Sequence, residues 1–381
     1  MNILRRTVFS AEHETYRQSV RRFFAEEVEP NIQQWERQGA MDRTVVRKAG
    51  ERGLLSPHIP VEYGGGGGDL LHQIVLWEEH GYSTAGAAFG SGLTADIIPQ
   101  MIFSCGTDEQ KKHWLPLYAS GKVLSDGLFT EPHSGSDVAS IKTRAHRDGD
   151  HYIVNGSKTW VTHSHLSEVF PTLVRTGGPG TKGLSLLMID PKLSGVEVLK
   201  PIDTMCRSAI NVGTVHFDHV RVPVSELLGD VEGQGMSQML SMVTIARVAL
   251  AARMLAACEL AFGMTVDLVN NREAFGKKLF DFQNTQFQLA SMKTEISVGR
   301  AFVDSLLVRL NDNAVSDVES SMAKLWVSEL EGRIMDQAVQ LHGAMGFAND
   351  NPISKMYTYA RAHRIFLGTS EIHRIIISRS I

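Results

Sequence analysis

Residues 241–271 read SMVTIARVALAARMLAACELAFGMTVDLVNN, in which Gly263 is almost the only helix breaker. Such a run predicts one helix of about 30 residues, against a globular mean of about 11 to 12. Residues 282–311 and 315–341 are similarly long. Helices of this length usually pack against partner helices, in the same chain or in another subunit. We therefore predict that residues 231–381 form a C-terminal helical bundle domain.

The sequence before this bundle changes character at about residue 121. Residues 152–161, YIVNGSKTWV, contain a central Asn155-Gly156 pair, which is the strongest short signal of a β-hairpin. Further short segments are rich in β-forming residues and are separated by glycine or proline: 184–189, 196–199 and 214–222. We predict a central β domain at residues 121–230, built as a sandwich or a barrel.

The first 120 residues read as helical. Apolar residues at helical spacing between Glu12 and Val28 predict a first helix, which the Glu29-Pro30 pair ends. Five consecutive glycines occupy residues 64–68, but no Gly-Lys-Ser/Thr follows them. We therefore interpret this run as a loop between helices and not as a phosphate-binding loop. The fold class is α+β, with a helical domain at 1–120, the β domain at 121–230 and the helical bundle at 231–381.

Composition excludes several classes of protein. The 381 residues include 38 Lys and Arg and 42 Asp and Glu, a net charge of −4 that gives no indication of a nucleic-acid or membrane-surface partner. Three cysteines without metal-ligand spacing exclude a disulfide scaffold, indicate no metal site and fit a reducing compartment. The sequence shows no apolar signal core and no uncharged apolar run near about 20 residues, so we expect a cytoplasmic protein without a membrane span.

Five motifs lie on this helix–sheet–helix order. Two are in the β domain and three are in the C-terminal domain. They read Leu128-Phe-Thr-Glu-Pro-His-Ser-Gly-Ser-Asp137, Lys158-Thr-Trp-Val-Thr162, Arg272-Glu-Ala-Phe-Gly-Lys277 with Phe282-Gln283, Gln340-Leu-His-Gly-Ala-Met-Gly-Phe347 and Gly368-Thr-Ser-Glu-Ile-His-Arg374.

In order and spacing these motifs resemble those of the acyl-CoA dehydrogenases. The first is similar to the Thr-Glu-Pro-x-x-Gly-Ser-Asp signature of that family, and the second to its Trp-Ile-Thr flavin motif. The resemblance covers essentially the whole chain and looks closest to long-chain and short-chain bacterial members. It implies a C-terminal four-helix bundle, FAD as cofactor and dehydrogenation of an acyl thioester.

A flavin site explains why these residue types occur together. FAD carries a pyrophosphate and a flat ring with polar edges, so it needs closely approaching N–H groups and an aromatic wall. Thr130, Gly135 and Ser136 offer the former, Trp160 a stacking face and Thr162 a hydroxyl. By resemblance, Arg272 contacts the pyrophosphate of a neighbouring subunit's FAD. The cofactor-binding residues so implied are Phe129, Thr130, Gly135, Ser136, Trp160, Val161, Thr162, Arg272, Phe275, Phe282, Gln283, Gln340, Leu341, His342, Gly343, Ala344, Thr369, Ser370 and Glu371. The substrate-binding residues so implied are Ser136, Thr244, Arg247, Leu367 and Gly368.

The sequence departs from the family at the catalytic base. Most members place a glutamate directly before the C-terminal Gly-Thr, where this chain has Leu367, and a minority place it before an arginine of the first long helix, where it has Ala246. Neither side chain accepts a proton. Asp96 and His133 are substitute candidates, although a helix cap and an exposed loop are the more ordinary interpretations of these two residues.

Four explanations of the missing base stay open. The chain is a glutamate-to-alanine variant, another residue is the base, the chemistry needs no base, or the chain is an inactive or acyl-thioester-binding homologue. The third would make it a flavin monooxygenase or reductase on the same scaffold. The leading hypothesis is an acyl thioester dehydrogenase acting on a coenzyme A or acyl-carrier-protein thioester. By resemblance we also expect electron-transfer flavoprotein as the electron acceptor and a homotetramer or dimer.

Overall fold

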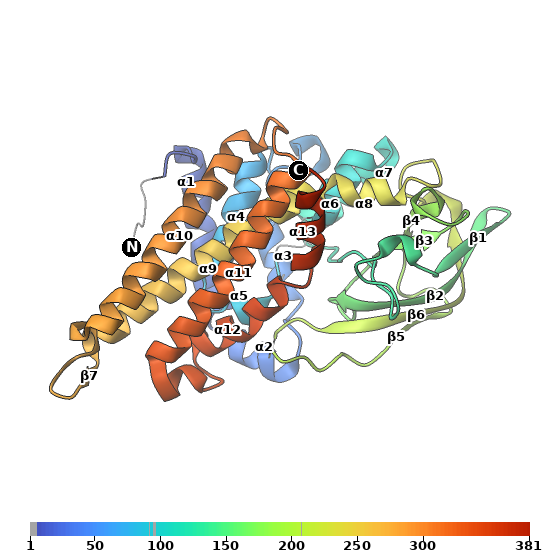
Figure 1. Ribbon diagram of the computed structural model, residues 1–381. Coiled ribbons are helices and arrows are strands. Elements are labelled where there is room, and N and C mark those ends of the chain that lie inside the picture. Colours follow the sequence, from blue (N-terminus) through green and yellow to red (C-terminus); the bar gives the residue numbers. More distant parts are fainter. Residues whose placement is uncertain (1–5, 91, 94–96, 207) are drawn as a thin grey trace.

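A computed structural model describes residues 6–90, 92–93, 97–206 and 208–381. Figure 1 shows the β-sheet at one end of the molecule and the long helices packed side by side at the other. The predicted order of a helical, a β and a second helical part is confirmed. The N-terminal and C-terminal helices share one core, in which α4 (Leu70–Tyr82) packs against the long central helix α9 (Val243–Asn271).

The N-terminal helices include the one predicted from the first apolar pattern. It runs as α1 and continues through a π-helical turn, η1, to Val28, just before Pro30. The glycine run is a loop before α4 that packs closely, because a Cβ on Gly65 would lie 2.2 Å from the Ile59 carbonyl oxygen. The elements are α1 (Ala11–Phe23), η1 (Phe24–Val28), α2 (Ile32–Gln38), α3 (Thr44–Glu51), η2 (Val61–Tyr63), α4 (Leu70–Tyr82), α5 (Gly86–Phe89), α6 (Ile97–Cys105) and α7 (Asp108–Ala119).

Helices α1 and α4 begin with linked capping boxes. Ser10 caps α1 and Asp69 caps α4, with His13 and His72 at the third helical positions. One oxygen of Asp69 lies 2.9 Å from a ring nitrogen of each histidine. The three side chains are close enough together to bind a metal ion, but the caps alone account for their positions.

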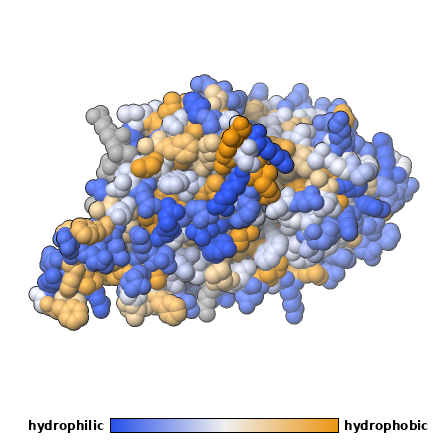
Figure 2. All heavy atoms as spheres, in the orientation of Figure 1, coloured by the Kyte–Doolittle hydropathy of each residue, from blue (hydrophilic) through white to orange (hydrophobic). Residues whose placement is uncertain are grey.

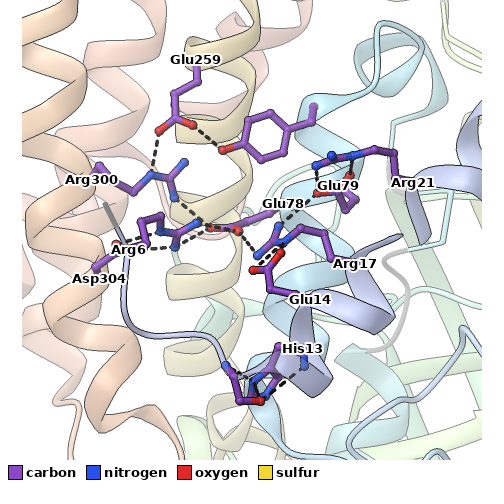
Figure 3. A network of polar contacts seen from close by, with 12 residues as sticks. Arg6, His13, Glu14, Arg17, Arg21, Glu78, Glu79, Glu259, Arg300 and Asp304 are labelled. Atoms are coloured by element: carbon purple, nitrogen blue, oxygen red, sulfur yellow. Dashed lines mark hydrogen bonds and ion pairs between the residues drawn. The ribbon is translucent and has the colours of Figure 1, made fainter. Parts of the chain in front are cut away.

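A buried ionic network fixes α1 to the helices behind it (Figure 3). Glu78 of α4 is fully buried and lies 2.8–3.0 Å from nitrogens of Arg6, Arg17 and Arg300. Burial by itself raises the pKa of Glu78, but the three guanidinium groups outweigh it and hold the value at about 2. The carboxylate therefore stays charged and joins the N-terminal segment to α4 and α10 (Gln283–Leu310).

The β domain is one six-stranded sheet in the order β4-β3-β1-β2-β6-β5. Buried side chains of β1, β2, β3, β4 and β6 share a single core. Strands β1 and β3 were not predicted. The elements are η3 (Val138–Ser140), β1 (Arg144–Asp148), β2 (His151–Thr162), β3 (Phe170–Arg175), η4 (Thr181–Gly183), β4 (Leu184–Ile189), β5 (Val196–Val198), β6 (Val212–Pro223) and η5 (Val224–Glu226).

The prediction of a hairpin turn at Asn155-Gly156 is wrong. Strand β2 runs through both residues, and the turn to β1 lies instead at Gly149, which has φ 63°. Gly156 marks an irregularity in the pairing of β2 with β6, and a Cβ there would lie 2.5 Å from Thr143 Oγ1. Glycine is needed at this position for a bulge and a close approach, not for a turn.

The three long helices of the C-terminal part match their predicted segments and are α9, α10 and α11. One described helical stretch, Gly235–Asn271, is long and apolar enough to cross a membrane, yet 78% of its most apolar window is buried within the protein, as in a core helix. The elements are α8 (Gly235–Ser241), α9 (Val243–Asn271), β7 (Glu273–Ala274), β8 (Lys277–Lys278), η6 (Leu279–Asp281), α10 (Gln283–Leu310), α11 (Asp317–His342), η7 (Gly343–Phe347), α12 (Pro352–His363) and α13 (Ser370–Ser378).

Candidate active site

The signature loop at residues 128–137 is held rigidly against the sheet. Leu128 exchanges backbone hydrogen bonds with β3, and Glu131 and Ser134 donate to each other's carbonyls at 2.8 and 3.0 Å. The buried Glu131 carboxylate accepts the N–H groups of Lys142 and Thr143 at 2.7 and 2.9 Å. The loop therefore presents a fixed row of backbone groups.

A buried ion pair joins the first two motifs. Lys158 of β2 donates to Glu131 at 2.9 Å and to the Phe129 carbonyl at 3.1 Å, and the Thr159 N–H donates to the Thr130 carbonyl at 2.9 Å. Burial lowers the pKa of Lys158 to about 8, although the nearby Glu131 carboxylate opposes this shift. Loop and strand therefore form a single surface.

This surface offers the groups that a flavin ring needs. The N–H groups of Thr130, Gly135 and Ser136 donate to no other described residue. A bulge in β2 between Lys158 and Val161 gives Trp160 a φ of 60° and leaves its side chain 58% exposed. Thr162 is half-buried beside it, whereas the Val161 side chain points into the core, so only its backbone is available. These residues fit a bound flavin, with Trp160 as the stacking face.

Asp126 lies next to this surface and was missed by the sequence analysis. Burial raises the pKa of its carboxyl, while the Gly127 N–H at 2.8 Å and the Thr162 hydroxyl oppose that shift. An Asp126-Gly127 pair directly before the apolar pair Leu128-Phe129 was the signal that could have identified it. It is the acidic residue that the structure places behind the predicted flavin contact Thr162.

Arg247, which follows Ala246, and the backbone of Leu367 both lie close enough to His373 to influence it, so the two family base positions belong to one region of the fold. Ala246 is buried in the first turns of α9, near the half-buried Thr244. Its neighbour Arg247 donates to Asp317 and, at 3.0 Å, to Ser321, both on α11. The N-terminal end of α9 is thereby fixed to α11, the helix that also supports the turn containing Leu367.

Leu367 lies in a strained turn between α12 and α13. It has φ 54° and Gly368 has φ 92°, and the Leu367 N–H donates to no described residue. Lys324 of α11 donates to the Gly368 carbonyl at 2.6 Å, and the His373 ring packs against Gly368. A free N–H in a fixed turn is the kind of donor that polarises a carbonyl oxygen.

The remaining residues of this turn serve the structure of α13. The Thr369 hydroxyl caps the helix by accepting the Ile372 N–H, and the buried Ser370 donates to Glu329 at 2.8 Å. Glu371 is exposed. The hydroxyls of Thr369 and Ser370 therefore already make hydrogen bonds, although the Thr369 oxygen can accept a further one.

The two substitute bases gain no support from the structure. His133 is an exposed residue of the signature loop, and its recorded ion-pair partner is Glu131 at 3.4 Å. Asp96 lies outside the described residues. Both remain predictions.

The other predicted FAD contacts lie at the far end of the helices (Figure 1). Arg272 follows α9 and starts the β7–β8 hairpin, about 37 Å along the helix from Arg247 at about 1.5 Å per residue. Phe275 at the hairpin tip is 96% exposed. Phe282, Gln283, Gln340, Gly343 and Ala344 are likewise exposed or half-buried, whereas Leu341 packs against the core and the buried His342 ring contacts the Ala338 carbonyl at 2.8 Å. Within one chain, this end is therefore far from Ala246 along α9.

Comparison with known proteins agrees with the order of a helical, a β and a second helical part. Models of the acyl-CoA dehydrogenase N-terminal, middle and C-terminal domains match residues 10–122, 128–220 and 233–381. The long-chain specific acyl-CoA dehydrogenase of Rattus norvegicus mitochondria is 38% identical over 99% of this chain and 88% of its own.

Solved structures give the same result. An acyl-CoA dehydrogenase from Geobacillus kaustophilus superposes with a TM-score of 0.94 at 34% identity, over 98% of both chains. One from Bacillus anthracis, complexed with FAD, has a TM-score of 0.88 at 28% identity, over 98% of this chain and 67% of its own. The chain therefore belongs to the acyl-CoA dehydrogenase family of FAD-dependent oxidoreductases.

Proposed function

We propose that the protein dehydrogenates an acyl-CoA at its α,β-carbons without a glutamate at either family base position. The observation that carries this proposal is the Leu367 N–H, which lies in a fixed turn and donates to no acceptor among the described residues. A donor at the thioester oxygen would stabilise the negative charge that develops as the α-proton passes to a water molecule, which takes the place of the missing carboxylate. Bound FAD supplies the hydride acceptor.

The residues around the turn support this assignment by their charge. Arg247 and Lys324 are both buried there. Arg247 carries a positive charge, and Lys324, whose pKa burial lowers to about 7, carries one in part of the molecules near neutral pH. Positive charge near the thioester favours an enolate, so it partly compensates for a missing carboxylate by making the α-proton more acidic. Thr130, Ser136 and Thr162 would hold the edge of the flavin ring, and Trp160 would stack against one face of the ring.

We favour coenzyme A over a carrier protein because a basic cleft opens next to the signature loop. The cleft has a volume of about 640 Å³ and is lined by Lys142, Arg144, His146 and the 175–180 loop. Arg175 shapes this loop by donating to the Gly178 and Gly180 carbonyls at 2.6 and 3.0 Å. Exposed cations on a preformed cleft suit the phosphates of a nucleotide.

The assignment is tested by anaerobic mixing of the FAD-loaded protein with saturated acyl-CoAs of several lengths. Bleaching of the flavin with at least one of them is the expected result. Bleaching only by a separate reductant, followed by oxygen uptake that depends on a second substrate, would indicate a monooxygenase. Binding of acyl-CoA without any redox change would indicate an inactive or binding homologue.

We also propose a homotetramer or dimer in which the β7–β8 hairpin of one chain reaches the cofactor of another. The separation of Arg272 from the flavin surface supports this, as do the exposed Phe275 and Phe347 (96% and 86%). Figure 2 shows apolar atoms at this end of the molecule. A monomer by light scattering that keeps one FAD per chain would contradict it. Electron-transfer flavoprotein as acceptor and a cytoplasmic location remain part of the same proposal.

A further inference from the structure

Lys324 is an unusual lysine that the proposed mechanism does not yet use. Its side chain is fully buried on α11, and its recorded hydrogen bond is the 2.6 Å contact with the Gly368 carbonyl. A buried ammonium group is normally paired with a carboxylate, because burial of an unpaired charge is unfavourable. Here the partner is a backbone carbonyl in the turn that follows the family base position.

The turn needs such a restraint. Leu367 carries a side chain yet has φ 54°, a conformation that persists only where the surroundings impose it. On one side the turn meets the His373 ring, since a Cβ on Gly368 would lie 3.2 Å from its Cε1 and Nε2 atoms. On the other side Lys324 holds the Gly368 carbonyl. Gly368, the residue directly after Leu367, is thus held from α11 by Lys324 and from α13 by His373.

The charges around Lys324 come from three elements. Arg247 faces it from α9, His373 and Glu371 from α13, and Glu329 lies on its own helix. Burial and then Arg247 lower the pKa of Lys324 to about 7, against the opposing carboxylates. Burial also lowers the pKa of His373 to about 3, so its ring is neutral near pH 7. Of Arg247, Lys324 and His373, Lys324 is therefore the residue whose charge changes near pH 7.

We propose that Lys324 is a positioning residue for the thioester, because its grip on the Gly368 carbonyl keeps the Leu367 N–H directed into the substrate site. This rests on the proposed function, in which that N–H polarises the thioester oxygen. Lys324 does not touch the substrate. Its loss would let the turn relax and would weaken the donor without removing it.

Two variants test the hydrogen bond from Lys324 to the Gly368 carbonyl. Lys324→Met keeps the length of the side chain but cannot donate, whereas Lys324→Arg still donates. Lys355→Met is the matched control. Lys355 is a partly buried lysine of α12, and it pairs at 2.7 Å with Glu36 of α2 and not with the Leu367 turn. All three are first compared with the wild type for FAD content and melting temperature.

The direct readout is the absorption band of bound cinnamoyl-CoA, which shifts to longer wavelength as its thioester carbonyl is polarised. We expect the wild type, Lys324→Arg and Lys355→Met to shift the band and Lys324→Met to lose most of the shift. With saturated acyl-CoA, Lys324→Met should reduce the limiting rate of flavin reduction by up to about 10²-fold, the lower end of the effect of removing a polarising donor, while the substrate Kd changes little.

The outcomes distinguish this inference from the proposed function. A folded, FAD-loaded Lys324→Met protein with an unchanged band shift and unchanged reduction rate would overturn the role of Lys324. A wild type that shifts the cinnamoyl-CoA band but never bleaches with acyl-CoA would overturn dehydrogenation, and loss of that shift in Lys324→Met would still support the positioning role.

Discussion

Ala246→Glu tests whether the protein is a dehydrogenase that lacks only its base. Ala246 is buried in the first turns of α9, beside Arg247, so a glutamate there would enter the site from a rigid helix. Burial raises the pKa of a carboxyl, and Arg247 would keep it from rising too far for a base near neutral pH. General-base catalysis contributes typically about 10²–10⁴-fold.

We expect Ala246→Glu to accelerate flavin reduction by at least about 10²-fold, which corresponds to about 2.7 kcal/mol of barrier. The larger side chain in a packed site would cost about 1–3 kcal/mol of stability, so FAD content must be checked first. The assay is single-turnover flavin reduction by a saturated acyl-CoA without oxygen. Ala246→Gln is the control, because it has the same shape but no basic carboxylate and should give no acceleration.

Leu367→Glu is the alternative restoration at the other family position. Leu367 packs partly against the helical core, so we expect a smaller gain there than at Ala246. If neither glutamate accelerates reduction while FAD stays bound, the missing-base explanation is wrong. A different base or a different reaction would then have to be preferred.

Three further predictions concern stability and assembly. Glu78→Gln would leave buried arginines without their shared carboxylate and should lower the free energy of unfolding by about 3–5 kcal/mol in urea titrations, against less than about 1 kcal/mol for Glu295→Gln, whose partner Arg333 is exposed. Lys324 has a folded pKa of about 7, below its ordinary value of 10.5. The unfolded chain therefore binds more protons between these values, and stability should rise with pH across that window by up to about 1.4 kcal/mol per unit, a rise that Lys324→Met would lack. Arg272→Ala should lower FAD content, measured by absorbance after gel filtration, while the melting temperature of the FAD-free protein stays the same; unchanged FAD content would contradict a role for the hairpin.

Long, regular segments were predictable from the sequence, because their pattern repeats over many residues. The three long helices and the order of helical and β parts follow from breaker-free runs and from short apolar segments. The bulge at Gly156 was not predictable, because the same Asn-Gly signal serves a turn or a bulge, and only the approach of Thr143 to Gly156 decides between them.

The candidate site was predictable where residues adjacent in sequence act together. Glu131 and Lys158 belong to the quoted motifs, but their ion pair depends on how loop and strand meet. Lys324 and Asp126 carry no motif of their own, since each becomes notable only through a distant contact or through burial. Such residues require the folded chain.

The central claim is that an acyl-CoA reduces the FAD of this protein. The most direct measurement is the flavin absorbance after anaerobic mixing of the wild type with saturated acyl-CoAs of several chain lengths, each paired with its free fatty acid as control. The account predicts bleaching with at least one thioester, slower than after Ala246→Glu, and none with the free acids. Unchanged absorbance with every chain length, while FAD remains bound, would contradict it.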